Sequence, residues 1–267
     1  MYCRGENLKM KKEIYNESLR EKKRRVVTED GSATLFSYEF DEAYHSTKDG
    51  AFHESLQKHV NPAFALQKEK DMLTVLDICF GLGYNTLATL YYVRQQKLQT
   101  KIHILSPEFD EKLVRSLSDF EYPKAFDDLK PIIEVLSREF YYEDEQFKIE
   151  ILLGDARESI PKIKEKIDIV YQDAFSPAHN PLLWTKEYFS ALRSICADDA
   201  ILTTYSTAAA VRLGLYENGF KIFAYGGKGV RPSIIASPQS LDLEPIDMIL
   251  KIQRNPLARS LKDRDYL

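Results

Sequence analysis

Apolar runs of strand length alternate with amphipathic segments of helix length from residue 73 onward. This alternation is typical of a parallel α/β sheet, in which a helix follows each strand. The runs predict five parallel strands, at Leu73–Cys79, Lys101–Glu108, Phe147–Gly154, Ile167–Asp173 and Ala200–Ser206. Two more runs predict a closing hairpin, at Lys221–Tyr225 and Ser233–Ser237. We therefore expect an α/β fold with a mostly parallel seven-stranded sheet and helices on both faces.

Capping residues support the helices that this scheme requires. The segment 85–96 follows the first strand and has a helical pattern. Thr185 is suited to cap a helix that ends near Cys196, because a threonine hydroxyl accepts an N–H group of the first helical turn. Segment 207–218 predicts a further helix, closed by Gly219 in the position where glycine readily adopts a left-handed conformation.

Two segments lie outside the strand–helix alternation. Residues 1–60 form an N-terminal extension with aromatic, strand-like residues around Thr34–Phe40. Residues 109–146 form an acidic insert that we expect to be helical, with breaks at Pro123 and Pro131. We divide the chain into an N-terminal extension at 1–60, an α/β domain at 61–240 that contains the insert, and a basic C-terminal tail at 241–267.

The composition narrows the class of protein. The 267 residues are 44% hydrophobic and 29% charged, which is ordinary for a globular protein. No apolar run approaches the roughly 20 residues that span a bilayer, and the charged first 25 residues lack the apolar core of a secretory signal. The three cysteines form no CxxC pair (Cys3, Cys79, Cys196). We therefore expect a cytoplasmic protein without a metal site or a membrane partner.

The charge is distributed unevenly along the chain. Residues 1–25 hold nine Lys/Arg and four Glu, and residues 251–267 hold five Lys/Arg and two Asp. Residues 105–145, in contrast, hold five Lys/Arg and twelve Asp/Glu. Basic ends on an acidic body suit a polyanion-binding surface, and they equally suit solvated tails.

A glycine turn follows the first predicted strand. Asp77 lies near the end of the strand, and Gly81 and Gly83 open a helix that contains Asn85. Glycines at such a turn let the backbone approach a ligand closely. The position of the third glycine in a dinucleotide fingerprint is occupied by Thr86. The segment instead resembles the first motif of class I S-adenosylmethionine-dependent methyltransferases, in which Asp77 would face the amino-acid end of the cofactor.

Acidic residues also follow the other strands. Glu108 ends the second strand, where a carboxylate can accept both ribose hydroxyls, although it lies further from the glycines than the usual spacing of about 20 residues. Asp155 follows the third strand and is placed to bond an adenine amino group, and it also suits a helix N-cap. Because the carboxyl ends of parallel strands meet at one edge of the sheet, these acids predict a cofactor site there.

The loop after the fourth strand, Asp173 to Trp184, has the character of a reaction site. It begins with a carboxylate, has Phe175 two residues later and contains two prolines. A carboxylate can orient an amine and take its proton, and an aromatic ring can stack on a nucleic-acid base. We expect His179 to be a solvated loop residue and Trp184 to belong to the core.

This loop resembles the signature of the MnmC-type methyltransferases, which act on the tRNA wobble uridine. The matching run is Asp-Ala-Phe-Ser-Pro-Ala-His-Asn-Pro-Leu-Leu-Trp-Thr. Tyr44-His45-Ser46, Gly50–Ser55, the glycine loop and the segment 204–220 are also similar to the family, so the resemblance covers roughly residues 25–240. It implies a Rossmann-like class I fold and N-methylation of 5-aminomethyl-(2-thio)uridine to 5-methylaminomethyl-(2-thio)uridine.

The resemblance also implies roles for individual residues. The residues that would bind S-adenosylmethionine are Tyr44, Glu54, Asp77, Gly81, Gly83, Asn85, Glu108, Asp155 and Asp173. Asp173 would act at the target amine, with Phe175 beside the base. Tyr44 and the Gly50–Glu54 segment would close over the cofactor. Phe175, Asn180, Lys228 and Arg231 would contact tRNA.

The chain departs from the family in two places. The usual Gly-Phe-Gly-x-Lys-Arg turn is replaced by Tyr225–Pro232, which leaves the register of Lys228 and Arg231 open. The flavin oxidase domain of the large family members has no counterpart in these 267 residues, so we expect a standalone methyltransferase, with a separate enzyme or pathway supplying the aminomethyl uridine.

Two other interpretations stay open at this point. The same scaffold suits an aminopropyltransferase or a small-molecule amine methyltransferase, although the second acid pair expected of an aminopropyltransferase is missing from the Asp173–Trp184 loop. A non-catalytic subunit that binds the cofactor or RNA is the other. Salt-sensitive binding of tRNA would favour tRNA methylation over the first alternative. Transfer of a methyl group to tRNA would favour it over the non-catalytic subunit.

Overall fold

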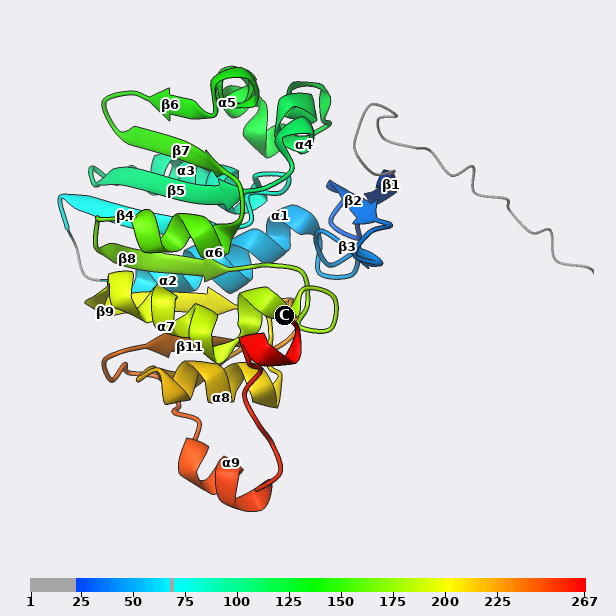
Figure 1. The fold of residues 1–267 in the computed structure, drawn as a ribbon. Helices are drawn as coiled ribbons and strands as arrows, with labels where there is room; N and C mark the ends of the chain where they lie inside the picture. Colours follow the sequence, from blue (N-terminus) through cyan, green and yellow to red (C-terminus); the bar gives the residue numbers. More distant parts are fainter. Residues whose placement is uncertain (1–22, 68–69) are drawn as a thin grey trace, which may run out of the picture.

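The computed structural model describes residues 23–67 and 70–267, and its main feature is one eight-stranded sheet (Figure 1). The strand order is β10-β11-β9-β8-β4-β5-β7-β6. The strands are β4 (Met72–Ile78), β5 (Lys101–Glu108), β6 (Tyr141–Glu143), β7 (Phe147–Leu153), β8 (Ile167–Gln172), β9 (Cys196–Thr204), β10 (Lys221–Tyr225) and β11 (Ser233–Ser237).

The five central strands are parallel, as the sequence predicts. β4 pairs in parallel with β5 on one side and β8 on the other, so the direction of winding reverses at β4. A crevice opens at such a switch point, beyond the carboxyl ends of the strands. The hairpin is also confirmed, because β10 and β11 pair antiparallel. The fold class is therefore the predicted Rossmann-like one.

The predicted number of seven strands is wrong by one. The eighth strand, β6, lies in the acidic insert and pairs antiparallel with β7. The insert is otherwise helical, as expected, with α4 (Glu111–Ser116), η2 (Leu117–Asp119), η3 (Lys124–Leu129) and α5 (Lys130–Glu139). After α5, Phe140 adopts a left-handed conformation and the chain turns back to the sheet edge. A strand of three residues is too short to show an alternating pattern in the sequence.

Helices cover both faces of the sheet and enclose a core on each side. Alternate strand residues point to opposite faces, so Val75 belongs to one core and Leu76 to the other. One face packs on α3 (Tyr84–Gln95) and on a continuous helical stretch of α1 (Ala51–Glu54), the π-helical η1 (Ser55–Val60) and α2 (Asn61–Leu66). The other packs on α6 (Ala156–Ser159), η4 (Ile160–Lys162), α7 (Lys186–Ile195) and α8 (Ala209–Glu217).

The predicted helix ends agree with the structure. The hydroxyl of Thr185 accepts the backbone N–H of Tyr188 at the start of α7. Gly219 follows α8 with φ +82°, the left-handed conformation expected of a C′ glycine. Trp184, which belongs to the core as expected, lies in η5 (Pro181–Trp184) and is fully buried. Pro131 does not break a helix: it lies in the first turn of α5, where proline is tolerated.

The N-terminal extension adds a small antiparallel sheet beyond the carboxyl ends of the central strands (Figure 1). Its strands are β1 (Lys23–Val27), β2 (Ala33–Ser37) and β3 (Glu42–Ala43). The part of the expected extension at residues 1–22 lies outside the described residues. The helical stretch from α1 to α2 runs through residue 60, the expected end of the extension.

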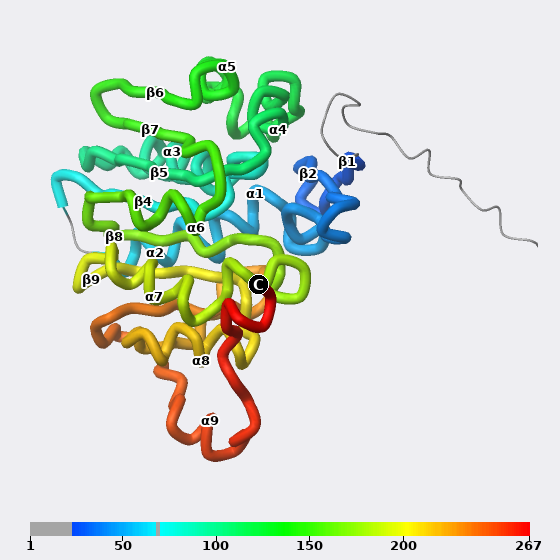
Figure 2. Tube along the Cα trace, in the orientation of Figure 1, coloured from blue at the N-terminus to red at the C-terminus, as the bar shows by residue number. Residues whose placement is uncertain are grey.

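The C-terminal segment returns to the sheet after α9 (Met248–Arg254), as Figure 2 shows in red. The backbone N–H of Lys186 donates to the carbonyl oxygen of Leu261, and Arg157 pairs with Asp263 in η6 (Asp263–Asp265). These contacts hold the segment beside α6 and α7. In the described residues, no helix is long and apolar enough to cross a membrane.

Candidate active site

A cavity lies at the switch point, between the carboxyl ends of β4, β5 and β8 and the N-terminal extension. Nine of the predicted site residues line it: Tyr44, Glu54, Gly81, Asn85, Glu108, Asp173, Phe175, Asn180 and Arg231. Of the other predicted site residues, Asp77, Gly83, Asp155 and Lys228 lie outside the lining. The fold thus brings together segments separated by almost 190 positions in the sequence (Tyr44 to Arg231).

The glycine turn forms one wall of the cavity through an unusual backbone path. Cys79, Gly81 and Gly83 all have positive φ, of 65°, 52° and 72°. A Cβ on Gly81 would lie 3.1 Å from the Tyr44 ring, and one on Gly83 would lie 2.8 Å from the Phe80 ring. Side chains larger than hydrogen are therefore disfavoured at both glycines, because left-handed backbone and close packing coincide there.

Asn85 joins the two acids at the ends of β4 and β8. Its amide nitrogen lies 2.9 Å from an Asp173 carboxylate oxygen and 3.3 Å from one of Asp77. Asp77 also accepts a hydrogen bond of 2.8 Å from the hydroxyl of Thr86. Burial raises the pKa of Asp77 to about 7. The side-chain oxygen of Asn85 is buried and has no partner within the described residues, so this wall offers a free acceptor.

Glu108 is anchored by the backbone of the glycine turn. One carboxylate oxygen accepts the N–H of Gly81 at 2.7 Å, and the other accepts the N–H of Asp110 at 2.8 Å. Burial raises the pKa of this carboxyl. A carboxylate has about four acceptor positions, so Glu108 can still accept a hydroxyl donor such as one of a ribose.

Asp155 takes the helix-capping alternative that the sequence left open. Its carboxylate accepts the N–H of Arg157 at the start of α6, and the side chain is exposed. The structure therefore places this acid at the same sheet edge as the others, yet away from the cavity lining.

Asp173 has His59 as a buried neighbour, and the sequence offered no expectation for this histidine. The Nε2 atom of His59 lies 3.4 Å from an Asp173 carboxylate oxygen, and its Nδ1 lies 2.9 Å from the hydroxyl oxygen of Thr203 on β9. Burial acts to raise the pKa of Asp173, but His59, His45 and Asn85 outweigh it and hold that pKa below its ordinary value. Asp173 is therefore a carboxylate at neutral pH.

His59 gave no signal in the sequence because its position depends on η1. This π-helical turn buries Lys58, His59 and Val60 in succession, whereas an α-helix presents only one face to a core. Pi-helical turns are rare and often occur at functional sites. The sequence offers one indication of a role for His59: this histidine lies within the part of the chain that resembles the family.

Aromatic rings surround the start of the loop after β8. The ring of Phe175 stacks on Phe40 at a centroid distance of 4.5 Å and meets Tyr44 edge-on at 4.9 Å. Phe40 therefore covers one ring face of Phe175. Trp184 donates its indole N–H to the carbonyl oxygen of Phe175 at 2.8 Å, so Trp184 supports the loop from the core.

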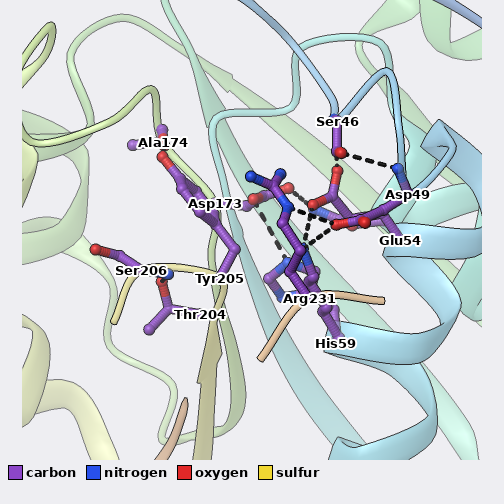
Figure 3. A network of polar contacts seen from close by, with 12 residues as sticks. Ser46, Asp49, Glu54, His59, Asp173, Ala174, Thr204, Tyr205, Ser206 and Arg231 are labelled. Carbon is purple, nitrogen blue, oxygen red and sulfur yellow. Dashed lines mark hydrogen bonds and ion pairs between the residues drawn. The ribbon is translucent and has the colours of Figure 1, made fainter. Parts of the chain in front are cut away.

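A charge cluster, in which Asp49, Glu54 and Lys58 are buried and Arg231 is exposed, lies beside the cavity (Figure 3). Glu54 and Arg231 line the cavity. Lys58 donates to Glu54 and to Asp49, each at 2.7 Å, and Arg231 donates to Asp49 at 3.2 Å. Glu54 also accepts the backbone N–H of Ser46 at 2.7 Å. These contacts tie the β10–β11 loop to the N-terminal extension, which encloses the cavity from that side.

The remaining loop residues are more peripheral. The side chain of Lys228 is exposed, and its carbonyl oxygen accepts the ring N–H of His53 at 2.8 Å. His179 is exposed, as expected, and contacts the carbonyl oxygen of Phe40. Tyr205, which the sequence analysis did not name, lines the cavity and donates to the carbonyl oxygen of Ala174 at 2.9 Å. No group of three metal-ligating side chains occurs within residues 23–67 and 70–267.

The fold is shared with a solved structure. MnmC2 from Aquifex aeolicus is 31% identical in sequence and superposes with a TM-score of 0.79, over 91% of this chain and 79% of that one. This chain belongs to the MnmC-type methyltransferase family. The model of a family of S-adenosyl-L-methionine-dependent methyltransferases also matches residues 126–238. S-adenosylmethionine is therefore the cofactor of this MnmC-type chain.

Two further relatives are similar to this MnmC-type protein over most of its length. An uncharacterised protein of Methanocaldococcus jannaschii is 31% identical over 267 residues, covering 96% of this chain and 70% of the relative. The tRNA 5-methylaminomethyl-2-thiouridine biosynthesis bifunctional protein MnmC of Paraburkholderia xenovorans is 27% identical over 219 residues, covering 76% of this chain. The chain spans about a third of the length of that bifunctional relative.

The cavity suits this cofactor chemically. S-adenosylmethionine carries hydroxyls, an ammonium, a carboxylate and a sulfonium. Glu108 offers acceptors for hydroxyls, the free oxygen of Asn85 suits an ammonium, and the Asp173 carboxylate suits a cation. Arg231 reaches the same cavity with a guanidinium that suits a carboxylate. The donors and acceptors that line the cavity therefore fit the cofactor.

Proposed function

We propose that this protein transfers a methyl group from S-adenosylmethionine to the 5-aminomethyl group of (2-thio)uridine at the tRNA wobble position. The product is 5-methylaminomethyl-(2-thio)uridine. The observation that carries the proposal is the Asp173 carboxylate, which stands in the cavity at the head of the family's signature loop. The name of the Paraburkholderia relative supports the substrate.

We assign the cofactor contacts from the geometry. Glu108 would accept the ribose hydroxyls, and Asn85 would contact the ammonium, while Gly81 lets the backbone pass close beside Tyr44. Asp77 would act indirectly: it lies outside the cavity lining and accepts a hydrogen bond from the side-chain amide of Asn85. Glu54 and Tyr44 would close the cavity from the extension. When bound, the cofactor supplies an electrophilic methyl group on a positively charged sulfur.

Asp173 would orient the amine and stabilise its charge. The lone pair of the amine forms the new N–C bond as the S–CH3 bond breaks, so positive charge develops on the nitrogen. A carboxylate already fixed beside that nitrogen stabilises the charge without reorganising. A general base works best with a pKa near the working pH. Since the pKa of Asp173 is lowered, we assign it to orientation rather than to proton storage.

The aminomethyl group must come from an earlier reaction, because methyl transfer only adds a carbon to an existing amine. We propose that a separate catalytic unit supplies it. Phe175 and Asn180, at the loop beside Asp173, would contact the uridine from the cavity wall. Lys228 and Arg231 were expected to contact tRNA, and we now assign Arg231 to the cavity wall, where its partner is Asp49.

The test is transfer of a labelled methyl group to tRNA that carries aminomethyl uridine. We expect the wild-type protein to label this tRNA, and Asp173→Ala to reduce kcat by roughly 10²–10³-fold, as for other removed charge-stabilising groups. Asp198→Ala is the matched control, because Asp198 is a fully exposed carboxylate, and we expect it to have wild-type activity.

Three results would count against the proposal. Unchanged transfer by Asp173→Ala would remove the role of Asp173. Label in small amines but not in tRNA would favour a small-molecule methyltransferase. Binding of both ligands with no transfer by the wild-type protein would indicate a non-catalytic subunit.

A further inference from the structure

A groove lined by several positively charged side chains lies between α8 and α9. Figure 1 labels these two helices. Arg212 of α8 and Lys251 and Arg254 of α9 line it, and no Asp or Glu is present in its lining. Residues 248–262, which include α9, hold four Lys/Arg and no acid. The groove therefore has a local positive potential on a chain whose net charge is −4.

The three cations are not used by the fold. In the described part of the chain, the side chains of Arg212, Lys251 and Arg254 form no hydrogen bond and no ion pair. The Nε atom of Arg212 is buried without an acceptor. Other arginines of the same region are paired, such as Arg157 with Asp263. Because buried donors are normally satisfied, the free N–H group of Arg212 indicates an absent acceptor.

The start of α8 faces the same groove. Ala208 occupies the N-cap position and has no side-chain acceptor for the first N–H groups of this nine-residue helix. Ala209, the first residue of α8, lines the groove. An uncapped helix N-terminus favours an anion, and here it stands beside three unpaired cations.

The groove adjoins the active site along the chain. Tyr205 lines the active-site cavity, and Ala209 follows it by four residues. Four residues span at most about 14 Å even when fully extended. An anion bound in the groove would therefore lie within a few nucleotides of a base held at Asp173.

We propose that the α8–α9 groove binds the sugar-phosphate backbone of the RNA substrate next to the nucleotide that is methylated. The proposal rests on the proposed function, because it takes the substrate to be tRNA. The guanidinium groups of Arg212 and Arg254 suit phosphate oxygens through paired N–H donors. Lys251 adds a single positive charge, and the N-terminus of α8 adds backbone donors.

The test compares tRNA binding by the wild-type protein and by the variant Arg212→Gln, Lys251→Ala, Arg254→Ala at several salt concentrations. We expect the variant to bind about tenfold or more weakly near 0.1 M salt, with a salt slope smaller by about 2–3, because each lost phosphate contact removes nearly one unit. Affinity for S-adenosylmethionine should not change, since these residues lie outside the cavity lining.

A matched control separates local from general charge effects. Lys101 is exposed and without an ion pair in the described structure, and it starts β5, at the end of that strand opposite the active-site cavity. We expect Lys101→Ala to bind tRNA like the wild type, and Lys251→Ala alone to lower the salt slope by about one. Equal effects of the two single substitutions would overturn the proposal.

The outcomes distinguish this proposal from the proposed function. Labelling of tRNA with unchanged affinity in the triple variant would overturn the groove and leave the methyltransferase assignment intact. Groove-dependent tRNA binding without labelling would support the groove and overturn the methyltransferase assignment. Loss of binding to phosphatidylserine vesicles, with tRNA affinity unchanged, would assign the groove to a lipid surface and overturn the RNA proposal.

Discussion

The chemistry at the residue scale depends on how Asp173 is surrounded. In the sequence, Asp173 is recognisable from its place after a predicted strand and from its signature loop. Its neighbours His59 and Tyr205 and the bridging role of Asn85 are not recognisable there, because these contacts join residues up to 144 positions apart in sequence (His59 with Thr203). A residue's type and spacing thus indicated the reactive group, whereas its pKa depends on partners from other elements.

We expect His59→Gln to shift the acid limb of the pH–rate profile. His59 helps to hold the pKa of Asp173 below its ordinary value, against the effect of burial. Without it that pKa rises, so the active carboxylate form is lost at a higher pH, by about one unit for each 1.4 kcal/mol of lost interaction. The profile of kcat from pH 3 to pH 8 measures the shift, because the wild-type limb lies below the ordinary pKa of an aspartate, about 4.

Thr203→Val is the companion variant for this prediction. It keeps the imidazole of His59 but removes the hydroxyl at its Nδ1, so we expect a smaller shift in the same direction. An acid limb that stays at the wild-type pH in His59→Gln would show that the histidine only fills space.

The glycine turn between β4 and α3 decides the shape of the site at the element scale. Its strand, its helix and its position were predicted, and so was the need for glycine. The partners that enforce the glycines, Tyr44 and Phe80, were not, because the ring of Tyr44 reaches Gly81 from the N-terminal extension. The short strand β6 and the π-helical η1 were also missed, because neither leaves a regular apolar period.

We expect Gly83→Ala to destabilise the protein more than Gly219→Ala. Both glycines have positive φ, of 72° and 82°, so both substitutions cost about 1–2 kcal/mol of backbone strain. A Cβ on Gly83 also lies 2.8 Å from the Phe80 ring, whereas nothing lies within 4 Å of a Cβ on Gly219. The free energy of unfolding in urea measures the difference, and equal losses would contradict the steric argument.

The active-site cavity is a property of the whole molecule, since its walls come from the N-terminal extension, the central strands and the β10–β11 loop. A ligand that needs all of them binds the folded state only. We expect S-adenosylhomocysteine at a hundredfold excess over its Kd to raise the free energy of unfolding by about 2.7 kcal/mol.

At equal ligand concentration, we expect this gain to be smaller in Arg231→Ala. Arg231 lines the cavity and joins the loop to Asp49. The nearby exposed Lys228 lies outside the lining, so Lys228→Ala should keep the full gain. Urea unfolding with and without the ligand measures both variants. A full gain in Arg231→Ala would show that the loop does not contribute to cofactor binding.

The sequence by itself determined the order of strands and helices, the acids at the strand ends and the family to which its signature loop points. These are local features, because periodicity, caps and motifs are written in neighbouring residues. Only the tertiary structure decided that Asp155 caps a helix while Glu108 enters the cavity, that His59 supports Asp173, and that Arg212, Lys251 and Arg254 share one groove. Those outcomes depend on burial and on contacts between distant segments, which no local pattern records.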